Sequence, residues 1–88
     1  MTNVIWKYRL EAHEVNILLP HGATVLTARL QHDALSLWVQ CDPDAPKVLR
    51  TFRCVNTGYD FDATGLRYIA TDETQHGIVW HVYEKENV

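Results

Sequence analysis

Apolar and polar side chains alternate at every second position through most of this 88-residue chain. In the clearest stretch four apolar residues share one phase and three others lie between them: Leu35, Leu37, Val39 and Cys41 against Ser36, Trp38 and Gln40. Successive side chains of a β-strand point to opposite faces, so this period is typical of a strand with one buried face. The pattern therefore predicts an all-β protein.

Turn-forming residues interrupt the alternation roughly every ten positions and divide the chain into short strands. We predict seven of them, at residues 3–10, 15–19, 24–31, 35–41, 47–56, 66–71 and 78–84. Strands of this length and spacing predict an antiparallel β-sandwich or a small barrel. We expect residues 1–88 to form a single all-β domain in which residues 85–88 are frayed.

Several local features refine this prediction. The segment from Gln31 to Ala34 predicts a tight hairpin turn, and the alternation after Thr24 places Leu26 on the same face as Ala28 and Leu30. The last strand is apolar on both faces, which is typical of a central strand. We therefore expect His81, within that strand, to be a hydrogen-bonded sheet residue rather than a general base. Trp6 and Tyr8, on one face of the first strand, are expected in the core.

Charge and cysteine content narrow the functional classes. Eleven acidic and eight basic residues give a formal net charge of −3, which argues against direct nucleic-acid binding. Cys41 and Cys54 lie inside apolar strands and are expected to be buried thiols. The first residues hold no apolar stretch typical of a signal peptide, and nothing has the length of a membrane span, so we expect a cytoplasmic location. A domain this small gains stability by pairing, which makes a homodimer or higher oligomer a reasonable expectation.

The residue types that carry catalysis are present without the spacings that catalysis uses. None of the five histidines forms an HxH or HxxxH pair, and no CxxC or glycine-rich phosphate loop occurs. Ser36 lacks the glycines of a nucleophile elbow. We therefore expect no catalytic set, no metal site and no cofactor, and we predict that the protein is not an enzyme.

Trp38 is the residue that departs from the apolar phase of its strand. If its neighbours face the core, the indole faces solvent or a partner, and tryptophan and arginine dominate protein-binding hot spots. We predict a partner-binding site formed by Trp38 with Arg50 and Arg53 of the following strand and with Asp42 and Asp44 of the intervening turn. The alternative is that Trp38 covers the rim of a second sheet or packs under the long loop at residues 57–65.

Short strand-and-turn phrases give the chain a resemblance to a known group. They are Trp6-Lys7-Tyr8, Leu19-Pro20-His21-Gly22-Ala23, Leu37-Trp38, Asp42-Pro43-Asp44, Arg50-Thr51-Phe52-Arg53, Thr57-Gly58, Leu66-Arg67-Tyr68-Ile69 and Val79-Trp80-His81-Val82-Tyr83-Glu84. With these the chain resembles short proteins of unknown function encoded by bacteriophages and prophages. The resemblance implies an accessory protein made in the cytoplasm of an infected bacterium.

Three functions follow as hypotheses. The first is a non-enzymatic protein that binds a host protein, for example an inhibitor of a bacterial antiviral defence system. The second is a protein that sequesters a small nucleotide signal by stacking it on Trp38 or Trp80. The third is a structural or virion-associated protein whose strand edges assemble into an oligomer.

Overall fold

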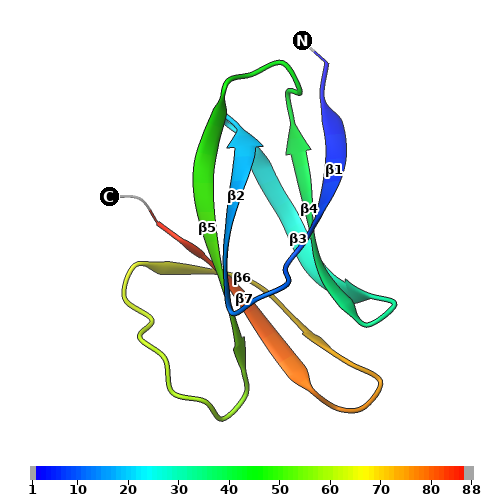
Figure 1. Cartoon of the computed structure of the whole chain (residues 1–88), viewed down its shortest axis with the longest axis vertical. Coiled ribbons are helices and arrows are strands. Elements are labelled where there is room, and N and C mark those ends of the chain that lie inside the picture. The colour runs from blue at the N-terminus through cyan, green and yellow to red at the C-terminus, as the bar shows by residue number, and fades with distance from the viewer. Residues whose placement is uncertain (1, 87–88) are drawn as a thin grey trace.

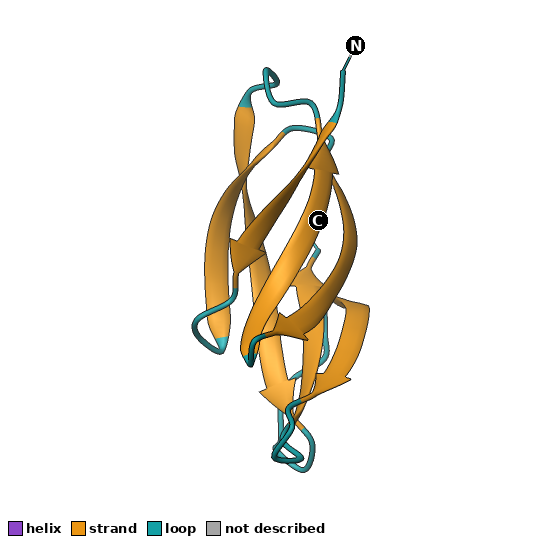
Figure 2. Cartoon of the chain, turned by 90° about the vertical axis from the view of Figure 1, so that its right-hand side faces the viewer, coloured by secondary structure: helices purple, strands orange, loops and turns teal. Residues whose placement is uncertain are grey.

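A computed structural model describes residues 2–86 as seven strands in two antiparallel sheets (Figure 1). Figure 2 shows strands joined by loops and turns, with no helix among these residues, so the described part of the chain has no helix that could cross a membrane. The predicted all-β fold of seven antiparallel strands is confirmed, and of the two predicted forms, sandwich or barrel, the two sheets correspond to the sandwich. The strands are β1 (Val4–Arg9), β2 (Glu14–Pro20), β3 (Thr24–Gln31), β4 (Ala34–Cys41), β5 (Lys47–Asn56), β6 (Leu66–Glu73) and β7 (Val79–Lys85).

The order of the strands in the sheets differs from their order in the chain. Sheet A has the order β1-β4-β3, and sheet B has the order β2-β5-β7-β6. The chain therefore changes sheet after β1, after β2 and again after β4, and β4 and β5 are consecutive strands in different layers. β7 lies between β5 and β6, which confirms the central strand predicted from its two apolar faces.

The core lies between the sheets and is formed by alternate residues of the central strands. Leu37 and Val39 of β4 face Phe52 and Cys54 of β5, and all four side chains are fully buried. Trp6 and Tyr8 are partly buried against this cluster, as expected. Both cysteines are buried and free, which confirms the prediction of structural thiols.

One predicted face is wrong in β3. The pairing with β4 shifts between Val25 and Thr27, which places Val25 opposite Val39 and Thr27 opposite Trp38. Leu26 is the extra residue of this β-bulge and is 46% exposed, so it does not share the buried face of Ala28 and Leu30. A bulge inserts one residue and so reverses the alternation beyond it, which the period of two alone does not reveal.

Two hairpins meet at one end of the molecule and join the sheets. His32 and Asp33 have φ values of 51° and 60°, the left-handed backbone of the tight turn predicted between β3 and β4. Asp33 accepts a hydrogen bond of 2.8 Å from the Gln75 side chain in the β6–β7 connection. The Leu30 N–H donates to Asp72 of β6 at 2.9 Å, so the edge strands β3 and β6 are linked.

The C-terminal segment is bonded as far as it is described. Lys85 is the last residue of β7, and the Glu86 N–H donates to the Gly65 carbonyl at 2.7 Å. Residues 87 and 88, the rest of the segment predicted to fray, lie outside the described residues.

Candidate binding surface

Trp38 occupies the middle of the outer face of sheet A. β4 is the central strand of this sheet, and its other face places Leu37 and Val39 in the core at 0% exposure. Trp38 is opposite Lys7 of β1 and Thr27 of β3, and its side chain is partly buried. The indole therefore points away from sheet B, as the sequence pattern predicted, and its neighbours partly cover it.

Long cationic side chains lie on the same outer face as Trp38, on both neighbouring strands. Arg9 and Arg29 are the cross-strand partners of Ser36, one step along the same face from Trp38. Ser36 points outward yet is only 1% exposed, and the apolar stems of long charged side chains can cover a residue of this size. Lys7 Nζ donates to the Gln31 side-chain oxygen of β3 at 2.7 Å, so the Lys7 side chain spans β4.

Together these residues form a cationic surface with apolar margins. Ile5 is 59% exposed opposite Gln40, and the bulge residue Leu26 is 46% exposed at the β3 edge, where it also borders a groove with Tyr68 and Ile69 of β6. Two acids border the cations: the Glu11 carboxylate lies 3.8 Å from Arg9 in an exposed ion pair, and Asp72 of β6 interacts electrostatically with Arg29. We call this surface the Trp38 face, formed by Ile5, Lys7, Arg9, Leu26, Thr27, Arg29, Trp38 and Gln40.

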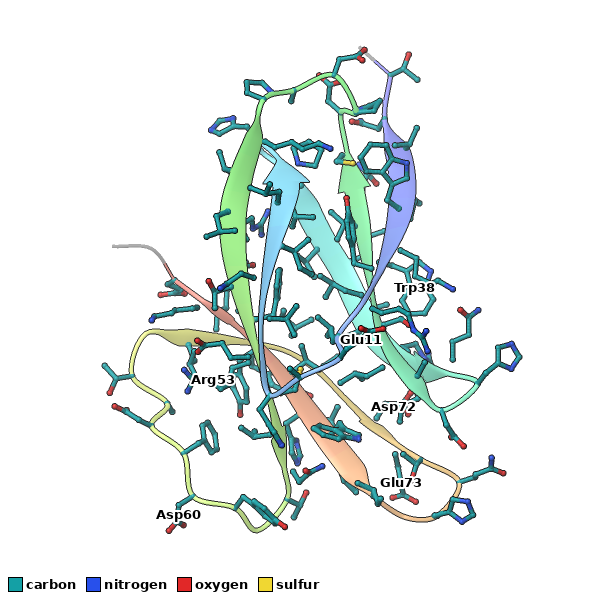
Figure 3. The ribbon with its side chains drawn as sticks, viewed as in Figure 1. Glu11, Trp38, Arg53, Asp60, Asp72 and Glu73 are labelled. Atoms are coloured by element: carbon teal, nitrogen blue, oxygen red, sulfur yellow. The ribbon has the colours of Figure 1, made fainter. Side chains whose placement is uncertain are left out.

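The structure does not bring the predicted arginines to Trp38. Arg50 lies on the inner face of sheet B, where its guanidinium binds the Glu84 carboxylate and the Ala23 carbonyl. Arg53 lies on the outer face of sheet B and binds Glu14 at 2.7 Å. Trp38 and Arg53 appear on opposite sides of the molecule in Figure 3. The prediction of neighbouring arginines on β5 was wrong because β5 belongs to the other sheet and does not pair with β4.

Asp42 and Asp44 have roles in their own turn. The Asp44 N–H donates to the Asp42 side chain at 3.0 Å, and the Ala45 N–H donates to the Asp42 carbonyl at 3.2 Å. These bonds fix the connection from β4 to β5. The aspartates lie beyond the end of β4, so they border the Trp38 face at most through its margin at Gln40.

The cations that do share the outer face with Trp38 were visible in the sequence but could not be assigned to it. Lys7 and Arg9 alternate with the apolar residues of β1, and Arg29 alternates with those of β3. Each was therefore recognisable as an outward-facing residue. What was missing was the pairing of β1 with β4, two strands that are far apart in the sequence.

The other candidate groups serve the structure. Both ring nitrogens of His81 are hydrogen-bonded, to Thr57 at 2.7 Å and to Thr71 at 2.9 Å, which confirms the expected sheet histidine. Burial raises the pKa of the Cys54 thiol to about 11, so it is a poor nucleophile at neutral pH. Among residues 2–86, no three His, Cys, Asp or Glu side chains lie close enough together to hold a metal ion.

The fold and surface define a small β-sandwich domain with a cationic, tryptophan-centred outer face. The chain belongs to the family described as a domain of unknown function, DUF7352, whose pattern matches residues 1–88. No curated protein and no solved structure matches the chain.

Proposed function

We propose that this protein is a non-enzymatic binding module and that the Trp38 face docks on an acidic surface of a partner protein. The observation that supports this most directly is the placement of a partly buried indole among three cations on the outer face of a central strand. Tryptophan and arginine contribute most to binding hot spots, and a pleated sheet presents them with little conformational freedom left to lose.

Charge complementarity predicts that the partner docks through an acidic surface. The protein has a net charge of −3, yet Lys7, Arg9 and Arg29 make this face locally positive. An acidic partner would be attracted to the Trp38 face and repelled by the rest of the molecule, which sets the orientation of docking. Trp38 and the margins at Ile5 and Leu26 would supply the apolar contact.

The resemblance to short bacteriophage and prophage proteins suggests where this partner is found. We propose that the chain acts in the cytoplasm of a bacterium and that the partner is a host protein. A component of an antiviral defence system is the partner class that we favour, and inhibition would follow if the docked sheet covered a working surface of that component.

Capture from bacterial lysate with matched variants tests the proposal. We expect Trp38→Thr, which keeps a residue of high strand propensity, to weaken binding of the captured protein roughly 30-fold or more. Arg29→Glu should weaken it about tenfold, and wild-type affinity should fall with rising salt. Arg53→Glu makes the same charge change on sheet B and should bind like the wild type.

Two results would contradict this function. One is the absence of any stoichiometric partner from lysate of a host that carries the gene. The other is a partner retained equally by Trp38→Thr and Arg29→Glu, or lost with Arg53→Glu. Unchanged circular dichroism and unfolding midpoints would establish that each variant is folded.

A second candidate, an oligomeric structural role, rests on an open strand edge. β5 pairs with β7 only from Phe52 onward. Within residues 2–86, the first half of β5, from Lys47 to Thr51, is therefore paired with a strand on one side only, which is β2 (Figure 1). Leu49 in this segment is 53% exposed, and an open apolar edge favours pairing with another strand. Sedimentation of the wild type and of Leu49→Lys tests it: a larger species lost in the variant supports assembly, and a monomer at all concentrations excludes it.

A further inference from the structure

A groove opens between the two sheets at the end where the hairpins meet, apart from the Trp38 face. One wall is the β1–β2 connection, which carries Glu11 (labelled in Figure 3) and His13, and the other is the start of β4. Trp80 of β7 and the core residues Leu10 and Leu35 form its apolar lining. Its volume is about 330 Å³, at the small end of the range for sites that hold small molecules. We call it the Trp80 groove.

The hydrogen bonds of His13 indicate which nitrogen of its imidazole donates and which accepts. Its Nδ1 lies 3.0 Å from the Cys54 carbonyl oxygen. A carbonyl only accepts, so Nδ1 carries the proton, and in this tautomer of the imidazole Nε2 is the acceptor. The Cys54 N–H in turn donates to the His13 carbonyl at 2.8 Å, which holds the residue from both sides.

The other polar side chains of the groove are also mainly acceptors. Glu11 and Asp33 contribute carboxylates, and the one cation, Arg9, already lies 3.8 Å from Glu11. These three groups give the rim a net charge of −1. A ligand that fits them must offer N–H donors and must not itself carry a large negative charge.

The aromatic side chains select the shape of the ligand. The rings of His13 and Trp80 have centroids 5.6 Å apart and are inclined at 43°, and Trp80 is only partly buried. A flat ring can lie against the indole while its edge meets His13 and the carboxylates.

We propose that the Trp80 groove binds an amino-substituted nitrogen heterocycle of the purine or pyrimidine type. The ring packs on Trp80, and its amino group donates to His13 Nε2 and to a rim carboxylate. The negative rim favours a free base or nucleoside over its phosphate. This site shares Arg9 with the Trp38 face but uses a different tryptophan and different polar groups, so either proposal stands if the other fails.

Nuclear magnetic resonance on the full-length chain tests the proposal. The three tryptophans give three indole N–H signals, and Trp80→Phe identifies the one from Trp80. Adenosine, adenosine monophosphate and purine riboside (purine below), which lacks the amino group and any N–H on the base, are titrated separately. We expect adenosine to shift the Trp80 signal saturably with a Kd of about 1 mM or tighter, and purine and the phosphate to bind about tenfold more weakly.

A matched variant separates the proposed contact from non-specific stacking. His13→Phe keeps an aromatic ring beside Trp80 and removes the acceptor, so it should weaken adenosine about tenfold and leave purine unchanged. The signals of Trp6 and Trp38 should not move in any titration. No saturable shift at about 10 mM adenosine, equal binding of adenosine and purine, or unchanged adenosine binding in His13→Phe would overturn the proposal.

Discussion

Glu84 is a charged side chain in the interior, and its partners make a quantitative prediction possible. The residue is 6% exposed on the inner face of sheet B, beside the fully buried Val82 and Phe52. Its carboxylate accepts two hydrogen bonds from Arg50, through Nε and Nη2, and a third from Arg67 Nη2 at 2.9 Å. The Arg50 side chain is 16% exposed, whereas that of Arg67 is 57% exposed.

The cost of breaking this cluster depends on which residue is changed. Glu84→Leu leaves the Arg50 guanidinium largely buried without its counter-ion, which costs about 3–5 kcal/mol. That is a large part of the roughly 5–15 kcal/mol that stabilises a typical domain. Replacing both partners, as Arg50→Met with Glu84→Leu, removes both buried charges and should restore most of the loss. Arg67→Gln removes an ion-pair partner of Glu84 that is largely exposed, so it should lower the free energy of unfolding by no more than about 1 kcal/mol.

The same cluster makes stability depend on pH in a defined direction. Burial opposes ionisation of Glu84, but the hydrogen bonds and charges of Arg50 and Arg67 outweigh it and hold the pKa of Glu84 below its ordinary value of 4.5. A carboxyl whose pKa is lower in the folded state than in the unfolded state stabilises the folded state. This contribution is complete above the unfolded pKa and is lost as the pH falls through the folded pKa. The stability difference between the wild type and the double variant should therefore be constant near neutral pH and shift against the wild type below about pH 4.5.

Urea unfolding followed by tryptophan fluorescence measures these free energies directly. Each chain is titrated at neutral pH and at several acidic values, and the double variant is the control for the other acidic groups. A Glu84→Leu variant within about 1 kcal/mol of the wild type would refute the argument that Arg50 depends on it. A double variant as unstable as Glu84→Leu would also refute it. The pH argument would be refuted if the difference in the free energy of unfolding between the wild type and the double variant did not change in acid.

Three further predictions concern the turn, the thiols and the core. His32 has a positive φ, so His32→Asn should raise the unfolding midpoint slightly, and the β-branched His32→Val should cost about 1–2 kcal/mol; calorimetry distinguishes these from no change. The Cys54 thiol has a pKa of about 11, and both thiols are buried. Iodoacetamide at pH 8 should therefore label neither Cys41 nor Cys54 until urea is added; rapid labelling of the native protein, seen by mass spectrometry, would contradict this. Leu37→Ala removes a fully buried side chain and should cost about 2–5 kcal/mol in urea unfolding, so a loss below about 1 kcal/mol would show that the core relaxes around it.

The sequence by itself determined the strands and the face on which most side chains lie. The alternation of apolar and polar residues predicted strand β4 and the outward direction of Trp38. The two apolar faces of residues 78–84 predicted that β7 is a central strand. The tight turn at His32 was also local, because a short connection between two alternating segments leaves the backbone few conformations. In each case the controlling interactions lie within a few residues along the chain.

Apart from the hairpin of β3 and β4, only the tertiary structure decided which strands are neighbours. The alternation of β5 shows that Arg50 and Arg53 point to opposite faces, but not that Arg50 meets Glu84, which is 34 residues away in the sequence. Likewise, Lys7 and Arg29 flank Trp38 because β1 and β3 pair with β4 in one register, with a bulge at Leu26. A period of two fixes the direction of a side chain and leaves its lateral neighbours open, because any strand edge can pair with many others. Burial of the two apolar faces against each other selects one of those pairings, and it is that selection that forms the Trp38 face and the Trp80 groove.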